Sequence, residues 1–205
     1  MNDGGSIVEF FYNIVPGVIF LIFLNFFGVI NIFPESSESV IIIFVLLVFG
    51  LFLGFLFQGI TVFLRHILNW NNRAYRRVRS DNLLFKRVYS TFDKSLNLKD
   101  HDYRMLFYIM DTRLRAEVPA FLPTHFSSLF AFWSNMFCAT ALLLVILVTR
   151  MFFYPSIVAD KIPVVHCLYF FLIISWLFAD KFLKSFYDTV LNAYYSKYLL
   201  EKEGM

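Results

Sequence analysis

Charged residues are scarce in this chain of 205 residues: Asp, Glu, Lys and Arg make up only 16% of it. Soluble domains carry about 25% charged residues and about 45–50% apolar ones. Here 59% of the residues are hydrophobic, and 28 of them are phenylalanine. This composition excludes an ordinary soluble domain, a disordered chain and a disulfide-rich secreted fold. It indicates an all-α, polytopic membrane protein.

Cysteine is also rare, and the two cysteines, Cys138 and Cys167, both lie in apolar segments. We expect both to be free thiols within helices. The four histidines have no spacing typical of a zinc site. The chain lacks a Walker A loop, GxSxG, HExxH and a dinucleotide-binding fingerprint. We therefore predict that the protein is not an enzyme and that it uses no catalytic residues, no metal and no cofactor.

Four apolar stretches reach or approach the length of about 20 residues that a membrane-spanning helix needs. They are Phe10–Phe33, Val40–Leu64, Leu129–Tyr154 and Val164–Leu183. The polar turn at 34–39 is so short that it joins only antiparallel neighbours, which predicts a helical hairpin. The predicted organisation is a first transmembrane hairpin (1–64), a basic helical cytoplasmic segment (65–125), a second transmembrane hairpin (126–183) and a cytoplasmic helical tail (184–205).

Lysine and arginine are distributed unevenly, and their placement predicts the orientation in the membrane. The turn at 34–39 has none, whereas the segment 65–125 has twelve basic residues against six acidic ones. Its net charge is about +6, although the whole chain carries only +3. We expect this segment and both termini to be cytoplasmic. We also expect the second span to continue past Leu64 as a stalk, and a further helix to run from Asp100 or Asp102 to about Glu117.

Basic and aromatic residues alternate at the start of the cytoplasmic segment. They are Trp70, Arg73, Tyr75, Arg76, Arg77, Arg79, Lys86 and Arg87. Arginine binds phosphate through two parallel hydrogen bonds, and aromatic rings stack on bases. These residues are a candidate binding site for an anionic ligand, such as a nucleotide or a single-stranded oligonucleotide. The alternative is a belt that contacts anionic lipid headgroups, where each charge contributes about 1 kcal/mol.

Polar residues share one side of each of the first two apolar stretches. On the first stretch they are Asn13, Asn25 and Asn31, and on the second they are Gln58 and Thr61, beside the GxxxG pattern Gly50–Gly54. Polar groups inside a membrane are costly and therefore suggest a role. One hypothesis is that these five polar residues line a pore in a symmetric oligomer. The other is that they serve only the packing of helices.

The layout of the chain is similar to that of the small four-helix membrane effectors of bacterial anti-phage defence, in particular the Hailong type. The resemblance rests on size, architecture and the basic-aromatic segment 70–92. It implies a tetrameric channel in the bacterial inner (plasma) membrane, held in check by single-stranded oligodeoxyadenylate that a partner nucleotidyltransferase makes. The expected function is a homo-oligomeric pore effector of abortive infection, gated by an anionic nucleotide at the basic segment. The alternative is a non-channel membrane adaptor whose basic segment docks a protein partner or anionic lipid.

Overall fold

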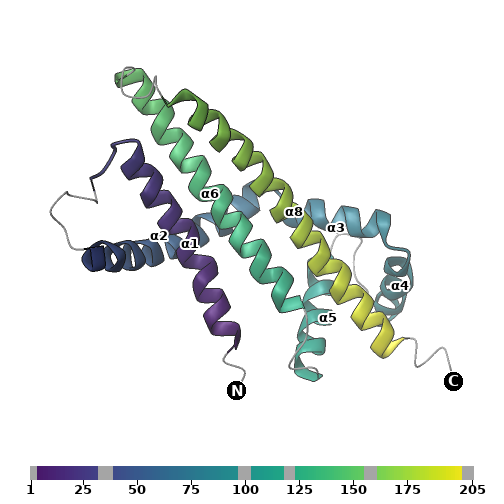
Figure 1. Ribbon diagram of the computed structural model, residues 1–205. Helices are drawn as coiled ribbons and strands as arrows, with labels where there is room; N and C mark the ends of the chain where they lie inside the picture. Colours follow the sequence, from purple (N-terminus) through teal and green to yellow (C-terminus); the bar gives the residue numbers. More distant parts are fainter. Residues whose placement is uncertain (1–3, 32–38, 97–102, 118–122, 155–160, 200–205) are drawn as a thin grey trace. The chain divides into compact units, whose positions relative to one another are not determined.

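The computed structural model describes residues 4–31, 39–96, 103–117, 123–154 and 161–199. Within these ranges the chain forms seven α-helices and no strand, which confirms the predicted all-helical class (Figure 1). The helices are α1 (Gly4–Phe26), α2 (Ser39–Ile67), α3 (Trp70–Asp81), α4 (Leu84–Leu96), α5 (Tyr103–Glu117), α6 (Pro123–Phe153) and α8 (Ile162–Tyr198). They separate into two compact units. Unit 1 takes Met1–Ile67 and Ser128–Ala179, and unit 2 takes Leu68–Ser127 and Asp180–Met205.

Three of the described helices are long and apolar enough to cross a membrane: Val40–Ile67, His125–Phe153 and Ile162–Tyr198. This finding indicates a membrane protein. The apolar part of α1, Phe10–Phe26, is shorter, and neither the predicted count of four spans nor the predicted hairpins are confirmed.

The first helix also ends earlier than the predicted Phe33. Gly28 adopts a left-handed φ of 65°, which few residues other than glycine reach easily. The N–H of Val29 then bonds back to the carbonyl of Leu24 at 2.8 Å. This is the arrangement with which many helices end, so the backbone leaves α1 although the side chains that follow are still apolar. Two cations donate to carbonyls at the end of this helix and just past it: Lys161 to Phe26 O at 2.5 Å and Arg150 to Phe27 O at 2.8 Å.

Backbone contacts between glycines join α1 to α2 within unit 1. A Cβ added at Gly17 would lie 1.9 Å from the carbonyl oxygen of Gly50, and one added at Gly54 would lie 1.8 Å from that of Asn13. At these distances there is no room for any side chain. Figure 1 shows α2 crossing α1. The GxxxG pattern of α2 therefore packs against a helix of the same chain, in the way that small residues let helices approach in membranes.

The core of unit 1 is apolar and is formed by α1, α2, α6 and the N-terminal half of α8. Phe20 and Phe57 pack edge to face at its centre, with ring centroids 5.2 Å apart. The other buried members are Leu24, Phe27, Cys138, Ala139, Leu143, Leu147 and Leu168. Most of α2 contributes little to this core, because only 17% of its most apolar window is buried.

Unit 2 consists of α3, α4, α5 and the C-terminal half of α8, each with one apolar face. These faces meet in a common core. Its buried residues include Trp70, Ala74, Val78, Phe85, Val88, Leu106, Met110, Leu114, Leu183, Val190 and Leu191. Such a core is what an amphipathic helix needs to be stable, since the buried stripe supplies most of its stability.

The predicted continuous stalk is wrong. α2 ends at Ile67, and Asn69 takes a left-handed conformation with φ 52° and ψ 32°, so the chain turns before α3 begins at Trp70. Asparagine tolerates this conformation better than most residues with a side chain. A second break follows at Asn82, whose side-chain oxygen accepts the N–H of Leu84 at 3.0 Å and caps the start of α4.

At the other end of the chain, α8 passes through the predicted boundary at 183/184 without a break. The polar pair Asp180 and Lys181, which shortens the apolar run, does not interrupt the helix. α5 ends at Glu117 as predicted, whereas its predicted start at Asp100 or Asp102 lies outside the described residues.

Candidate anion-binding site

The helix α3 carries most of the predicted ligand-binding residues, and it is strongly two-sided. Trp70 and Val78 are fully buried in unit 2, whereas Arg73, Arg76 and Arg77 are exposed. The arginines therefore lie on the solvent side of the helix. This is the arrangement that a site for a soluble anion requires.

The aromatic members of the predicted site have a different place. Trp70 is 0% exposed and Tyr75 is 7% exposed. The ring of Tyr75 packs on Phe107 and Tyr187, with centroids 5.3 Å and 4.4 Å away. These two aromatic residues anchor α3 in the core of unit 2. The exposed surface of α3 therefore presents its cationic side chains and not aromatic rings.

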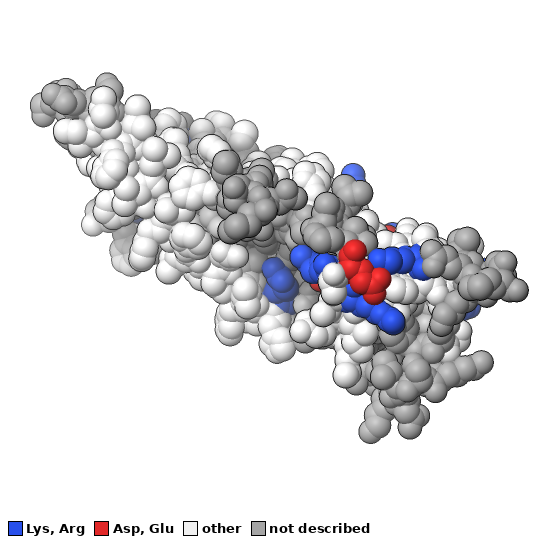
Figure 2. Space-filling view, turned by 90° about the horizontal axis from the view of Figure 1, so that it is seen from below, with Lys and Arg blue, Asp and Glu red and all other residues white. Residues whose placement is uncertain are grey.

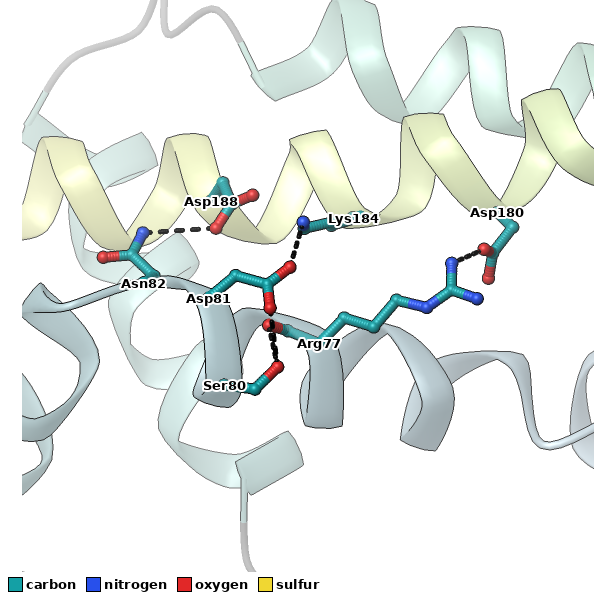
Figure 3. A network of polar contacts seen from close by, with 7 residues as sticks. All are labelled: Arg77, Ser80, Asp81, Asn82, Asp180, Lys184 and Asp188. Atoms are coloured by element: carbon teal, nitrogen blue, oxygen red, sulfur yellow. Dashed lines mark hydrogen bonds and ion pairs between the residues drawn. The ribbon is translucent and has the colours of Figure 1, made fainter.

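A ladder of polar contacts joins α3 to the C-terminal half of α8 within unit 2 (Figure 3). The guanidinium of Arg77 donates to the carboxylate of Asp180. One turn further along both helices, Lys184 Nζ lies 2.5 Å from Asp81 Oδ2. The two helices run in the same direction along this ladder, because residue numbers rise together on both sides.

The ladder continues at Asn82, at the end of α3. Its amide donates to Asp188 Oδ1 at 3.2 Å and to Asn192 Oδ1 at 3.3 Å. On α8 the four partners are spaced by four residues, which places them on one face of a helix. They are Asp180, Lys184, Asp188 and Asn192. This spacing was a signal in the sequence, but the sequence does not show which helix the face meets.

Burial differs sharply between the two members of the first pair. The side chain of Asp180 is 8% exposed and that of Arg77 is 55% exposed. A buried carboxylate is stable only when it is paired and hydrogen-bonded. Arg77 is thus both a member of the basic surface and the counter-ion of a buried acid.

The surface pairs of unit 2 lower the pKa of their acids. Hydrogen bonds from Lys184 and then from Ser80 hold the pKa of the Asp81 carboxyl below its ordinary value. In the same way, hydrogen bonds from Lys197 and then from Tyr198 lower the pKa of Glu117. Lys197 Nζ lies 2.8 Å from Glu117 Oε2. Both acids are therefore ionised partners of α8 at neutral pH.

The remaining basic residues of the predicted site are all exposed. Arg87 donates to the hydroxyl of Tyr195 at 3.1 Å. Arg76 and Lys86 are exposed and form no ion pair with any residue that the structure describes. Arg79 is exposed as well. Figure 2 shows basic side chains on several sides of an acidic group on one face of the protein.

Among the predicted pore-lining residues, Asn13 and Thr61 join a buried hydrogen-bond chain in unit 1. Asn135 on α6 donates to Asn13 Oδ1 at 3.2 Å and accepts from the hydroxyl of Thr61 at 3.3 Å. Thr61 also lies 3.3 Å from the carbonyl of Ser134. The sequence pattern gave no special weight to Asn135, although it links three helices.

The other three predicted pore-lining residues are not part of this chain of hydrogen bonds. Gln58 and Asn31 are exposed, and Asn25 is half-buried. The five residues therefore fall into two groups. Asn13 and Thr61 are hydrogen-bonded within one chain, whereas Gln58 is exposed on α2 and is available to a neighbour or to water.

Among the described residues, no three His, Cys, Asp or Glu side chains come together as a metal site. No protein-family model, curated protein or solved structure matches this chain.

Proposed function

We propose that this protein is a homo-oligomeric membrane channel, a tetramer by preference, whose opening is controlled by an anionic ligand at α3. The ligand class is a nucleotide or a single-stranded oligonucleotide made by a partner nucleotidyltransferase. The observation that carries the proposal is the contact of Arg77 with Asp180. Arg77 lies on the exposed cationic face of α3, and Asp180 lies on the helix that also forms a candidate membrane span.

The proposed gating follows from competition for one guanidinium. A phosphate group at the face formed by Arg73, Arg76 and Arg77 accepts strong, charge-assisted hydrogen bonds from arginine. Arg77 then divides its donors between the phosphate and Asp180. The change acts on α8, which is one helix from Ile162 to Tyr198. Binding thus shifts the population of two arrangements by its differential affinity for them.

The proposal that the protein conducts ions rests on uncharged polar groups in unit 1. Gln58 is exposed on α2, one turn before the buried Thr61. In a symmetric oligomer, a ring of such side chains lines a water path without a fixed charge. The proposed topology is four spans, with α1 as the first, and with both termini in the cytoplasm. The proposed location is a bacterial inner membrane, and the proposed role is anti-phage defence of the Hailong type.

Ion flux from liposomes tests the proposal directly. Purified protein is reconstituted into vesicles loaded with an ion-sensitive dye, and flux is measured without ligand, with mononucleotides and with single-stranded oligonucleotides. We expect flux that one ligand class switches on or off. Vesicles that stay tight under every condition would contradict a channel and favour the adaptor hypothesis.

Matched charge reversals then test the ligand site. Arg76→Glu should abolish the response to ligand, because it reverses an exposed charge at the centre of the proposed face. Arg115→Glu is the control, since its ion pair among the described residues is a local one with Asp111 on the same helix, at 2.8 Å. Equal loss of response in both variants would show a general electrostatic effect of unit 2 and would argue against a site at α3.

A further inference from the structure

An apolar cavity lies in unit 1 between α1, α6 and α8. Its volume is about 370 Å³. Side chains from all three helices form its walls, among them Phe20, Phe23, Ala139, Leu143, Cys167 and Phe171. An engineered apolar cavity of about 150 Å³ in another protein already holds benzene. The cavity is therefore large enough for a chain-like organic group.

The walls offer almost nothing to a polar ligand. The hydroxyl of Thr140 is committed to the carbonyl of Met136 at 2.8 Å, and the thiol of Cys167 is a weak hydrogen-bonding group. A bound water needs two to four polar partners, and a charged ligand needs a counter-charge. Neither is present on the walls, so the cavity suits a hydrocarbon group.

The position of the cavity indicates where this hydrocarbon comes from. Two of its three walls are candidate membrane spans, and Ala139 lies midway between His125 and Phe153, the ends of one of them. Cys167 lines the cavity and is itself exposed. The cavity therefore opens to the outside of the helices at a depth where a bilayer consists of acyl chains.

We propose that this cavity is a binding site for one acyl chain of a membrane phospholipid, which fills the space between α1 and the pair α6 and α8. A void of this size would leave its walls without van der Waals partners on one side. An inserted acyl chain supplies those contacts. These residues need not recognise the lipid headgroup. All residues that line the cavity belong to unit 1.

Photo-crosslinking of the whole protein in lipid nanodiscs tests this site. The probe is a phosphatidylcholine that carries a diazirine in one acyl chain, and the crosslinked peptides are identified by mass spectrometry. We expect labelling concentrated at residues 136–143 and 164–171, saturating near one probe per chain. Ala139→Leu, which fills the cavity, should reduce this labelling at least fivefold. Ala141→Leu makes the same change on α6 outside this cavity and should leave it unchanged.

Several outcomes would overturn the proposal. Labelling spread evenly over the exposed apolar residues of α2, or labelling of the cavity peptides that Ala139→Leu does not reduce, would show ordinary contact with surrounding lipid. Because Ala139 is buried, Cys167→Phe serves as a second blocking variant at the exposed edge and must give the same loss. Labelling by a free fatty acid with the same diazirine, but not by the phospholipid, would rule out a phospholipid as the source.

Discussion

Arg77 of α3 forms an ion pair with Asp180 of α8, a residue that is only 6% exposed. Removing the guanidinium leaves a buried carboxylate without its partner, which costs at least as much as is typical of an unsatisfied buried polar group, about 1–3 kcal/mol. We expect Arg77→Ala to destabilise unit 2 by at least that amount. Hydrogen exchange of the α3 backbone amides, measured by mass spectrometry, reports the change locally.

The control for this change is Arg76→Ala, one residue away. Arg76 is exposed and forms no ion pair with any described residue, so its removal should change stability by less than about 0.5 kcal/mol. Asp180→Asn should restore most of the loss in the Arg77→Ala background, because it removes the unpaired charge. Faster exchange of α3 in both arginine variants alike would show that the pair contributes nothing specific.

The glycine crossing of α1 and α2 gives a second prediction. Gly54→Ala would place a methyl group 1.8 Å from the carbonyl oxygen of Asn13, so the helices must separate. We expect a loss of about 1–3 kcal/mol, the usual cost of overpacking, seen as a lower thermal midpoint in detergent. Gly59→Ala is the matched control on the same helix, since a Cβ at Gly59 has no neighbour within 4 Å. That control should be neutral or slightly stabilising, because alanine favours helix more than glycine.

Gln58 and Thr61 lie one turn apart on α2 and should respond in opposite ways. Thr61→Val removes the hydrogen bond to Asn135 and should cost about 1 kcal/mol of stability, with little effect on conductance. Gln58→Leu removes an exposed polar group and should change conductance with little effect on stability. Single-channel recording and thermal unfolding separate the two effects. Unchanged conductance in Gln58→Leu would contradict a pore lining at this face.

The pair of Asp81 and Lys184 predicts a dependence on pH. The pKa of Asp81 is lower in the folded protein than in the unfolded chain, where it is about 3.9. The folded state then binds fewer protons than the unfolded chain. The stability that the Asp81–Lys184 pair adds is therefore fully present above the unfolded pKa and is lost as the pH falls through the lowered, folded pKa. Lys184→Met should therefore destabilise unit 2 at pH 7, and this difference should shrink as the pH falls below the ordinary value and through the lowered pKa of Asp81. The pKa of Glu117 is also lowered, so the stability that its pair with Lys197 adds should likewise be lost as the pH falls.

Both the pH and the salt concentration can be varied in that experiment. The Asp81 carboxylate is exposed, so 1 M salt should shrink the difference between wild type and Lys184→Met. Lys181→Met is the control, because Lys181 is exposed on α8 and forms no ion pair with a described residue. A difference that persists unchanged at pH 3 and at high salt would mean that Lys184 acts through packing of its alkyl chain.

The helical class could be predicted from the sequence, because long apolar runs leave few other folds open. The break between α2 and α3 could not, since it depends on one residue, Asn69, adopting a left-handed conformation. Nothing in the residues around it forbids a continuing helix. The end of α1 was visible in principle at Gly28, but glycine is also common inside apolar spans.

The candidate site was predicted in part. The exposed cations of α3 follow from helical periodicity, and the same periodicity, applied to Trp70 and Tyr75, would have placed these residues on the opposite, buried face. The partners of those cations could not be predicted. Arg77 and Asp180 are 103 residues apart, and contacts at such separations are decided by how whole helices pack. Asn135 was overlooked for the same reason, because its importance depends on neighbours from two other helices.

The glycine contacts also limit how unit 1 can move. Sliding α1 along α2 by one turn, about 5.4 Å, would bring Asn13 or Leu21 to the place of Gly17, where even a Cβ lies 1.9 Å from backbone. Translation is therefore blocked, while rotation about the point of contact keeps the glycines together. Any opening motion of the two helices must be a scissor movement about Gly17 and Gly50, with the largest displacements at the helix ends.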